Sequence, residues 1–281
     1  LVANLIDTTA SAAWFENATD VMPIHEGFNF ISQNDITADR SFWLRTTKIT
    51  KGVDIQVGYG TSTGISVGTF LYHGWGGYKH QYIFTADELA AEGLTAGPIT
   101  ALKFDVISTG ANPRPDFTIA LGHTTQNAVT STHIDNSLLT QVYSNSSESF
   151  TTGIKTFTFT VPFNWDGISN IVVQTNWNIG NYGGTSGALR YHTLTGVNRT
   201  LYTYADNKTA MEILTTNSGA VNGSGGTSTS NIRPNTIFVG NAGCQSPLIE
   251  IPITVSPKPL FEISTNKVTS CGGLNSELVT V

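Results

Sequence analysis

The sequence has few charged residues: Asp, Glu, Lys and Arg make up 12% of its 281 residues, and the net charge is -6. It contains no run of Lys or Arg, which disfavours a nucleic-acid-binding protein, because such a protein needs clustered cations against the phosphates. No apolar run approaches the roughly 18 residues of a membrane-spanning helix. The residues that follow Leu1 lack the positively charged segment with which a signal peptide begins. We therefore expect an extracellular segment of a longer protein, with no nucleic-acid partner and no membrane insertion.

Cysteine is also scarce, since Cys244 and Cys271 are the only two in the chain. We predict that they form a structural disulfide in an oxidising compartment, which would stabilise the fold by roughly 3 to 4 kcal/mol for a loop of this length. The alternative, two thiols that do not pair with each other, stays open, because the sequence does not tell whether the two sulfurs meet.

Motifs for metal binding and nucleophilic catalysis are missing as well. None of the six histidines lies in an HExxH motif or at a paired zinc spacing. Residues 64–68 match the letters of a G-x-S-x-G nucleophile elbow, but they lie in a polar loop before a predicted strand, without the helix that an elbow requires. We expect no catalytic residue, no cofactor and no metal site, and we leave calcium binding open.

Carboxylates that could form a glycoside hydrolase pair do occur. Asp105 lies between Phe104 and Val106 in an alternating segment, which predicts that it faces solvent on a strand. Asp166 lies in a turn, where a carboxylate commonly accepts hydrogen bonds from backbone N–H groups. The remaining candidates are Asp116, Asp135 and Glu148. We expect a structural role for Asp166 and predict that the chain is not an enzyme.

The stretch from Ile154 to Trp177 gives the clearest structural signal. Polar and apolar residues alternate from Lys155 to Val161, which predicts a half-buried strand. Residues 164–167 (NWDG) predict a reversal of the chain, and the β-branched residues that follow predict a second strand.

The rest of the body repeats this pattern, so we predict an all-β fold with a jelly-roll-like β-sandwich over residues 51–241. A capping-box sequence at Thr85 to Glu88 predicts one short helix, and the Gly- and Ser-rich residues 218–231 predict a mobile loop. The further strand candidates are 55–59, 67–73, 78–84, 99–107, 117–121, 138–143, 188–193, 200–204 and 235–239.

The two ends of the chain differ from the body. Residues 1–50 have the pattern of the C-terminal half of an immunoglobulin-like module, and residues 242–281 that of a linker strand and the N-terminal part of the next module. Together the two parts amount to roughly one module of that kind. We hypothesise a tandem array from which this chain is taken out of register.

Several stretches resemble known protein families. The segments QYIFTADELAAEGLTAGPITALKFDVIS, DFTIALGHTT and VPFNWDGISNIVVQTNW resemble a sandwich module of proteins exported by the type IX secretion system of Bacteroidota. The segments WFENATDVMPIHEGFNF and ITADRSFWLRT resemble the immunoglobulin-like repeats of large Bacteroidota surface proteins. Gln174 stands where relatives often carry an acidic residue, and Asp7-Thr8-Thr9 resembles their O-glycosylation motif, which makes Thr8 a candidate acceptor.

The resemblance implies a large, modular adhesin at the cell surface, similar to the filaments that gliding Bacteroidota move along their surface. Its implied partners are a surface polysaccharide or another cell-surface ligand, and neighbouring repeats of the same chain. Our interpretation is therefore a non-catalytic repeat segment that gives reach and multivalent attachment. The alternative is a carbohydrate-binding accessory module of a secreted hydrolase.

Aromatic residues beside glycine-rich loops give the best binding signal. Trp75 lies within residues 74–77 (GWGG) and Tyr78 follows them, while Trp177 precedes residues 178–187 and Tyr182 lies within them. Exposed rings of this kind could stack on sugar faces, which makes these four residues candidate glycan contacts. The alternative, which we favour, is that the rings fill the sandwich core, with Trp75 the best candidate for an exposed exception.

Overall fold

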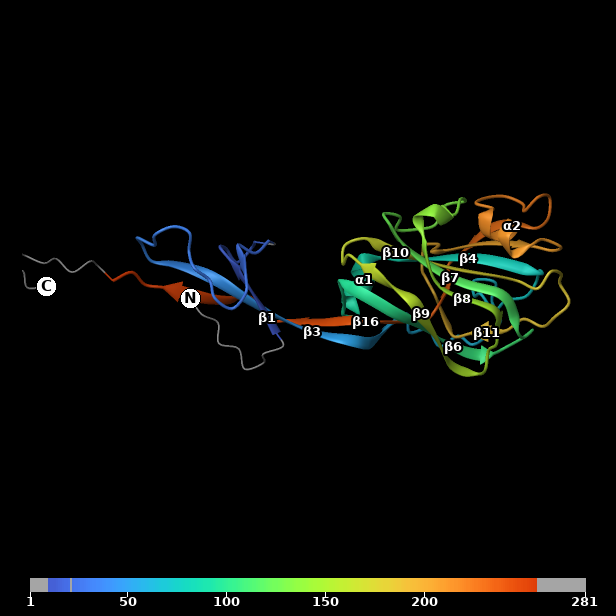
Figure 1. The fold of residues 1–281 in the computed structure, drawn as a ribbon, viewed down its shortest axis with the longest axis horizontal. Coiled ribbons are helices and arrows are strands. Elements are labelled where there is room, and N and C mark those ends of the chain that lie inside the picture. The colour runs from blue at the N-terminus through green and yellow to red at the C-terminus, as the bar shows by residue number, and fades with distance from the viewer. Residues whose placement is uncertain (1–9, 21, 257–281) are drawn as a thin grey trace, which may run out of the picture. The chain divides into compact units, whose positions relative to one another are not determined.

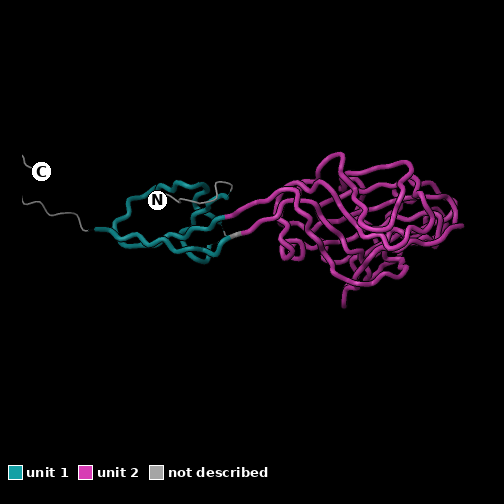
Figure 2. Tube along the Cα trace, turned by 90° about the horizontal axis from the view of Figure 1, so that it is seen from below, with its two compact units in different colours: residues 1–46, 246–281 teal, residues 47–245 magenta. Residues whose placement is uncertain are grey.

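The computed structural model describes residues 10–20 and 22–256 (Figure 1). The chain divides into two compact units, residues 1–46 with 246–281 and residues 47–245 (Figure 2). Almost all of the regular structure in both units is antiparallel strand, so the prediction of an all-β fold is confirmed. None of the helices within the described residues is long and apolar enough to cross a membrane.

The larger unit contains a six-stranded antiparallel sheet. Its strands lie in the order β14 (Gly226–Ser230), β13 (Thr200–Ala205), β4 (Gly77–Phe84), β10 (Asn170–Asn178), β7 (Arg114–Thr124) and β8 (Thr140–Glu148). Side chains alternate between its two faces, because successive residues of a strand point to opposite sides. The inner face carries the apolar set and the outer face a polar one.

A second sheet packs against the inner face. Within this unit it runs from β9 (Gly153–Trp165) through β6 (Gly97–Ser108) and β16 (Thr236–Gln245) to residues 47–57 of β3 (Arg40–Val57). Two short strands join it, β5 (Leu94–Thr95) on β16 and β11 (Ala188–Leu189) on β6, while β12 (Tyr191–Thr193) pairs with β15 (Ile232–Pro234) separately. Fully buried rings from both sheets form one core, among them Phe84, Phe104, Phe117, Phe157, Trp177 and Phe238.

The stretch that gave the clearest sequence signal links the two sheets. β9 alternates as predicted from Thr156 to Thr160, with Phe157 and Phe159 buried and the three threonines exposed, whereas Val161 is exposed. The chain then turns and enters β10 in the opposite sheet. Asp166 holds this turn, since its Oδ1 accepts hydrogen bonds from the N–H groups of Ile168 (2.9 Å) and Ser169 (2.8 Å). Slight burial would raise the pKa of Asp166, but the hydrogen bonds from the Ser169 hydroxyl and from these two N–H groups outweigh it and lower the pKa to about 2. The predicted capping role is confirmed.

One sequence prediction in this unit is wrong and another is wrong in part. Residues 67–71 form turns and residues 72–73 have no regular structure, where a strand was predicted, although Phe70 and Leu71 are fully buried. Side chains take over part of the ladder's role: the Trp177 indole donates to the Phe70 carbonyl (2.6 Å) and the Arg114 guanidinium to the Leu71 carbonyl (2.9 Å). The predicted loop at 218–231 contains β14, whose Thr227 side chain bonds Thr203 of β13 (2.7 Å), so its Ser and Thr residues serve a sheet edge.

Two short helices complete the unit. α1 (Ala86–Ala91) begins where the capping sequence predicted it, with the Thr85 side chain accepting from the Glu88 N–H. α2 (Ala210–Thr215) was not predicted, although Thr209 and Glu212 form a complete capping box there.

The smaller unit is a sheet built from both ends of the described chain. β1 (Ala10–Phe15) pairs with β2 (His25–Glu26), and β17 (Ile249–Ile253) pairs with residues 40–44 of β3. Trp14, Phe30 and Phe42 form its small core, with ring centroids 5.6 Å apart between Trp14 and Phe30 and 4.9 Å apart between Phe30 and Phe42.

Three sequence predictions stay predictions, namely the disulfide, the O-glycosylation and the tandem array. Cys244 is exposed, whereas Cys271 and Thr8 lie outside the described residues.

Candidate functional site

Tyr78 and Trp177, two of the four candidate glycan contacts, lie opposite each other on β4 and β10. Both are buried, with 1% and 0% of their surfaces exposed. Their ring centroids are 5.6 Å apart, and the Arg114 guanidinium lies 4.4 Å above the Trp177 ring. These two rings fill the core, as the alternative interpretation had it, and a sugar could not stack on them in this fold.

Trp75 and Tyr182 lie in two loops that Asp206 joins. The Asp206 Oδ1 accepts hydrogen bonds from the N–H groups of Gly76 (2.6 Å) and Tyr182 (3.0 Å). Trp75 is half-buried against Tyr204, with ring centroids 5.0 Å apart. Tyr182 is 58% exposed, so it is the candidate ring that offers a free face to solvent.

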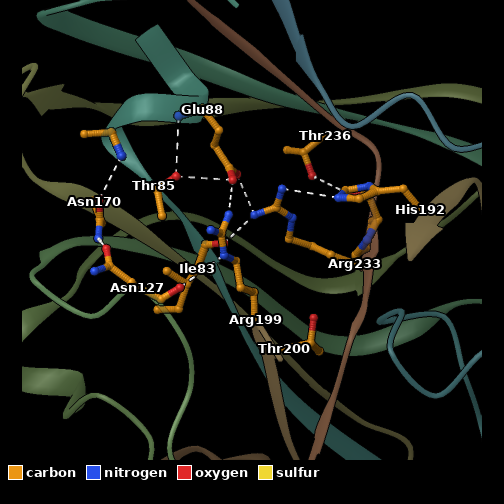
Figure 3. Close-up of polar contacts among 12 residues, drawn as sticks. Ile83, Thr85, Glu88, Asn127, Asn170, His192, Arg199, Thr200, Arg233 and Thr236 are labelled. Carbon is orange, nitrogen blue, oxygen red and sulfur yellow. Dashed lines mark hydrogen bonds and ion pairs between the residues drawn. The ribbon is translucent and has the colours of Figure 1, made fainter. Parts of the chain in front are cut away.

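A group of charged side chains lies at α1 (Figure 3). The Glu88 carboxylate pairs with two guanidinium groups, Arg199 at Oε2 and Arg233 at Oε1, the latter at 2.6 Å. Arg233 is 1% exposed, lies 4.0 Å above the Phe84 ring and also donates to the Ile83 carbonyl. Burial lowers the pKa of Arg233 to about 10, against the opposing effect of Glu88. This cluster ties α1 to β15 through Arg233 and to the residue before β13 through Arg199, which is a structural role.

A buried polar layer lies on the outer face of the six-stranded sheet, under α2 and the segment 133–136. The fully buried Lys79 donates from Nζ to two carbonyls at the C-terminal end of α2, those of Leu214 (2.9 Å) and Thr216 (2.5 Å). Gln81 bonds Gln174 (2.8 Å), and Gln174 in turn bonds Asn136 (2.9 Å). Both ends of the Gln174 side-chain amide are therefore hydrogen-bonded to neighbouring side-chain amides. Among the residues that the structure describes, no group of three or more His, Cys, Asp or Glu could hold a metal ion.

Buried bases in and behind this layer give the fold a pH dependence. Burial lowers the pKa of His80 to about 4 from its ordinary 6.5, and that of Lys79 to about 7 from its ordinary 10.5. The unfolded chain then binds more protons than the folded chain between about pH 4 and 6.5 and again above pH 7. Stability rises with pH wherever this holds.

We therefore expect the free energy of unfolding to rise from pH 5 to pH 9. Lys79 should contribute about 2 kcal/mol of this rise between pH 7 and 9. Urea denaturation at a series of pH values measures it, and Lys79→Met should flatten the upper part of the profile while leaving the rise below pH 6.5. An unchanged slope above pH 7 in Lys79→Met would contradict this assignment.

The same outer face carries a row of polar residues across neighbouring strands. Ser144 of β8 lies opposite Thr118 of β7, Thr118 opposite Asn176 of β10, and Asn176 opposite Lys79 of β4. α2 covers the Lys79 end of the row. The other end is open and forms the floor of a groove of about 510 Å³, with α2 as one wall. Hereafter this is the α2 groove.

Sequence reasoning missed the α2 groove, because its residues come from four separate segments of the chain. The alternation of polar residues along β7 and β10 indicates that each strand has a polar face, but only the strand register shows which of these residues share a row.

Searches of protein-family models, curated proteins and solved structures give no match to this chain.

Proposed function

We propose that the chain is a non-catalytic segment of a large secreted or cell-surface adhesin, whose larger unit binds a surface polysaccharide. The observation that carries the proposal is the α2 groove, an open hollow on a sheet face whose lining combines amide and hydroxyl side chains with an apolar surface. Such groups match the hydroxyl groups of a sugar, and weak sites of this kind add up when modules repeat.

The surroundings of three of the five candidate carboxylates support a non-catalytic role. Asp105 pairs with Arg190 (2.7 Å), and Glu148 pairs with Lys155 (2.5 Å) and accepts from the Tyr143 hydroxyl. Asp166 holds its turn. A general acid or base needs a side chain free to exchange a proton with a substrate, and these three are occupied by structural partners.

A carbohydrate-binding accessory module of a secreted hydrolase would use the same groove. The two proposals differ in what the rest of the parent protein contains, namely further adhesive modules or a catalytic domain. Attachment to a cell surface and a part in gliding belong to the first proposal.

Binding to an array of plant, algal and host polysaccharides tests the function. We expect the whole chain to be retained on at least one of them, and we expect the heat-unfolded chain, spotted as control, not to be. Absence of retention across the array would contradict polysaccharide binding under either proposal.

A further inference from the structure

We infer that the α2 groove is the binding site and that it takes a neutral, hydroxyl-rich oligosaccharide chain. This inference rests on the proposed function and adds to it the place of the site and the class of the ligand. It follows from one unpaired buried atom, from the chemistry of two groove sides and from the distribution of charge.

The unpaired atom is the side-chain oxygen of Asn176. The residue is 1% exposed and lines the groove, and its Nδ2 donates to the Ala210 carbonyl (3.4 Å), but its Oδ1 has no partner. A buried acceptor without a donor is unfavourable by about 1–3 kcal/mol. A ligand hydroxyl that donates to this oxygen, after the Asn176 side chain rotates toward the groove, would remove that cost.

The two sides of the groove differ in the way that the two aspects of a sugar ring differ. The floor strands present Thr118, Ser144 and Gln141, which can bond ring hydroxyls. The α2 wall presents Met211, which is 64% exposed, and Leu214. A thioether and an aliphatic side chain suit the C–H patches of a sugar, so one ring can satisfy floor and wall together.

The charge in the groove favours a neutral ligand. Asp116 is the ionisable residue of the lining, and it carries negative charge. The nearest cation in the row, Lys79, is fully buried and its ammonium group is directed to two backbone carbonyls. A uronic acid or sulfated chain would therefore meet repulsion without a compensating cation. The volume of about 510 Å³ lies within the roughly 300–1,000 Å³ of small-ligand sites.

Titration of the whole chain with neutral and acidic polysaccharides tests this inference, using a β-glucan, a mannan and a xylan against alginate and a sulfated galactan. Met211→Glu places a carboxylate on the α2 wall, in addition to that of Asp116 on β7, without disturbing a buried residue. We expect it to weaken binding of the neutral polysaccharide at least about tenfold. Asn176→Ala should weaken it about threefold to tenfold. Ile154→Glu, at a similarly exposed apolar residue of β9, is the matched control and should bind like the wild type.

The outcomes separate the site from the function. Neutral binding that Met211→Glu loses and Ile154→Glu keeps supports both. Polysaccharide binding that Met211→Glu and Gln141→Ala leave unchanged overturns the α2 groove as the site while the proposed function stands, and it does so even if Asn176→Ala fails to fold. Preference for alginate or the sulfated galactan overturns the ligand class, and binding to none of the five polysaccharides contradicts the inference and weighs against the function.

Discussion

Replacing Glu88 with Gln should lower the free energy of unfolding by about 3–5 kcal/mol, because it leaves the buried Arg233 guanidinium without a counter-charge. Arg233 is 1% exposed and pairs with Glu88 at 2.6 Å, so water cannot take the place of the carboxylate. The substitution keeps the size of the side chain and the hydrogen bond from the backbone N–H of residue 88 to the Thr85 side chain, so the loss of stability reports on the charge. Urea denaturation at neutral pH measures it.

The matched control is Asp54→Asn, which removes one carboxylate from an ion pair with Lys103 at 2.7 Å. That Asp54 side chain is 52% exposed, and exposed pairs contribute about 0–1 kcal/mol. A loss in Glu88→Gln as small as that in Asp54→Asn would mean that the cluster of Figure 3 does not hold the end of the sandwich together.

Replacing Trp177 with Ala should destabilise the larger unit by about 3–5 kcal/mol, as expected for a large ring removed from a packed core. The indole also donates to the Phe70 carbonyl at 2.6 Å, and this bond helps hold a buried segment that has no sheet ladder of its own. Trp177→Phe keeps most of the ring volume and loses the bond, so we expect an intermediate loss. Thermal or urea unfolding gives the order of the three proteins.

Tyr182→Ala is the control for this series, because its ring is 58% exposed. Exposed substitutions usually change stability by no more than about 0.5 kcal/mol. If Trp177→Ala instead kept its stability and lost polysaccharide binding, Trp177 would be a ligand platform and the core described above would be wrong.

The sequence predicted those parts of the fold that local periodicity and local hydrogen bonds determine. The alternation in residues 155–161 predicted β9, the NWDG turn predicted the reversal before β10, and the Thr85 to Glu88 capping sequence predicted α1. Each of these depends on residues within one turn or one strand. Their physical cause can therefore be read along the chain.

Features that depend on distant pairs could not be predicted in this way. The apolar residues at 67–73 look like a strand, but long-range bonds from Trp177 and Arg114 hold them as turns. The Glu88 pair with Arg233 and the polar row of the α2 groove need the strand register, which a single sequence does not state. The aromatic candidates show the same limit, since burial decided between core and surface for Tyr78 and Trp177.

We propose that this chain binds a polysaccharide without cleaving it. The most direct measurement is to incubate the whole chain with a neutral polysaccharide that it retains on the array, and to follow both the bound fraction and the chain length of the sugar. We expect binding that Met211→Glu weakens, with a polysaccharide of unchanged length. A shortened polysaccharide, or full binding in Met211→Glu, would contradict it.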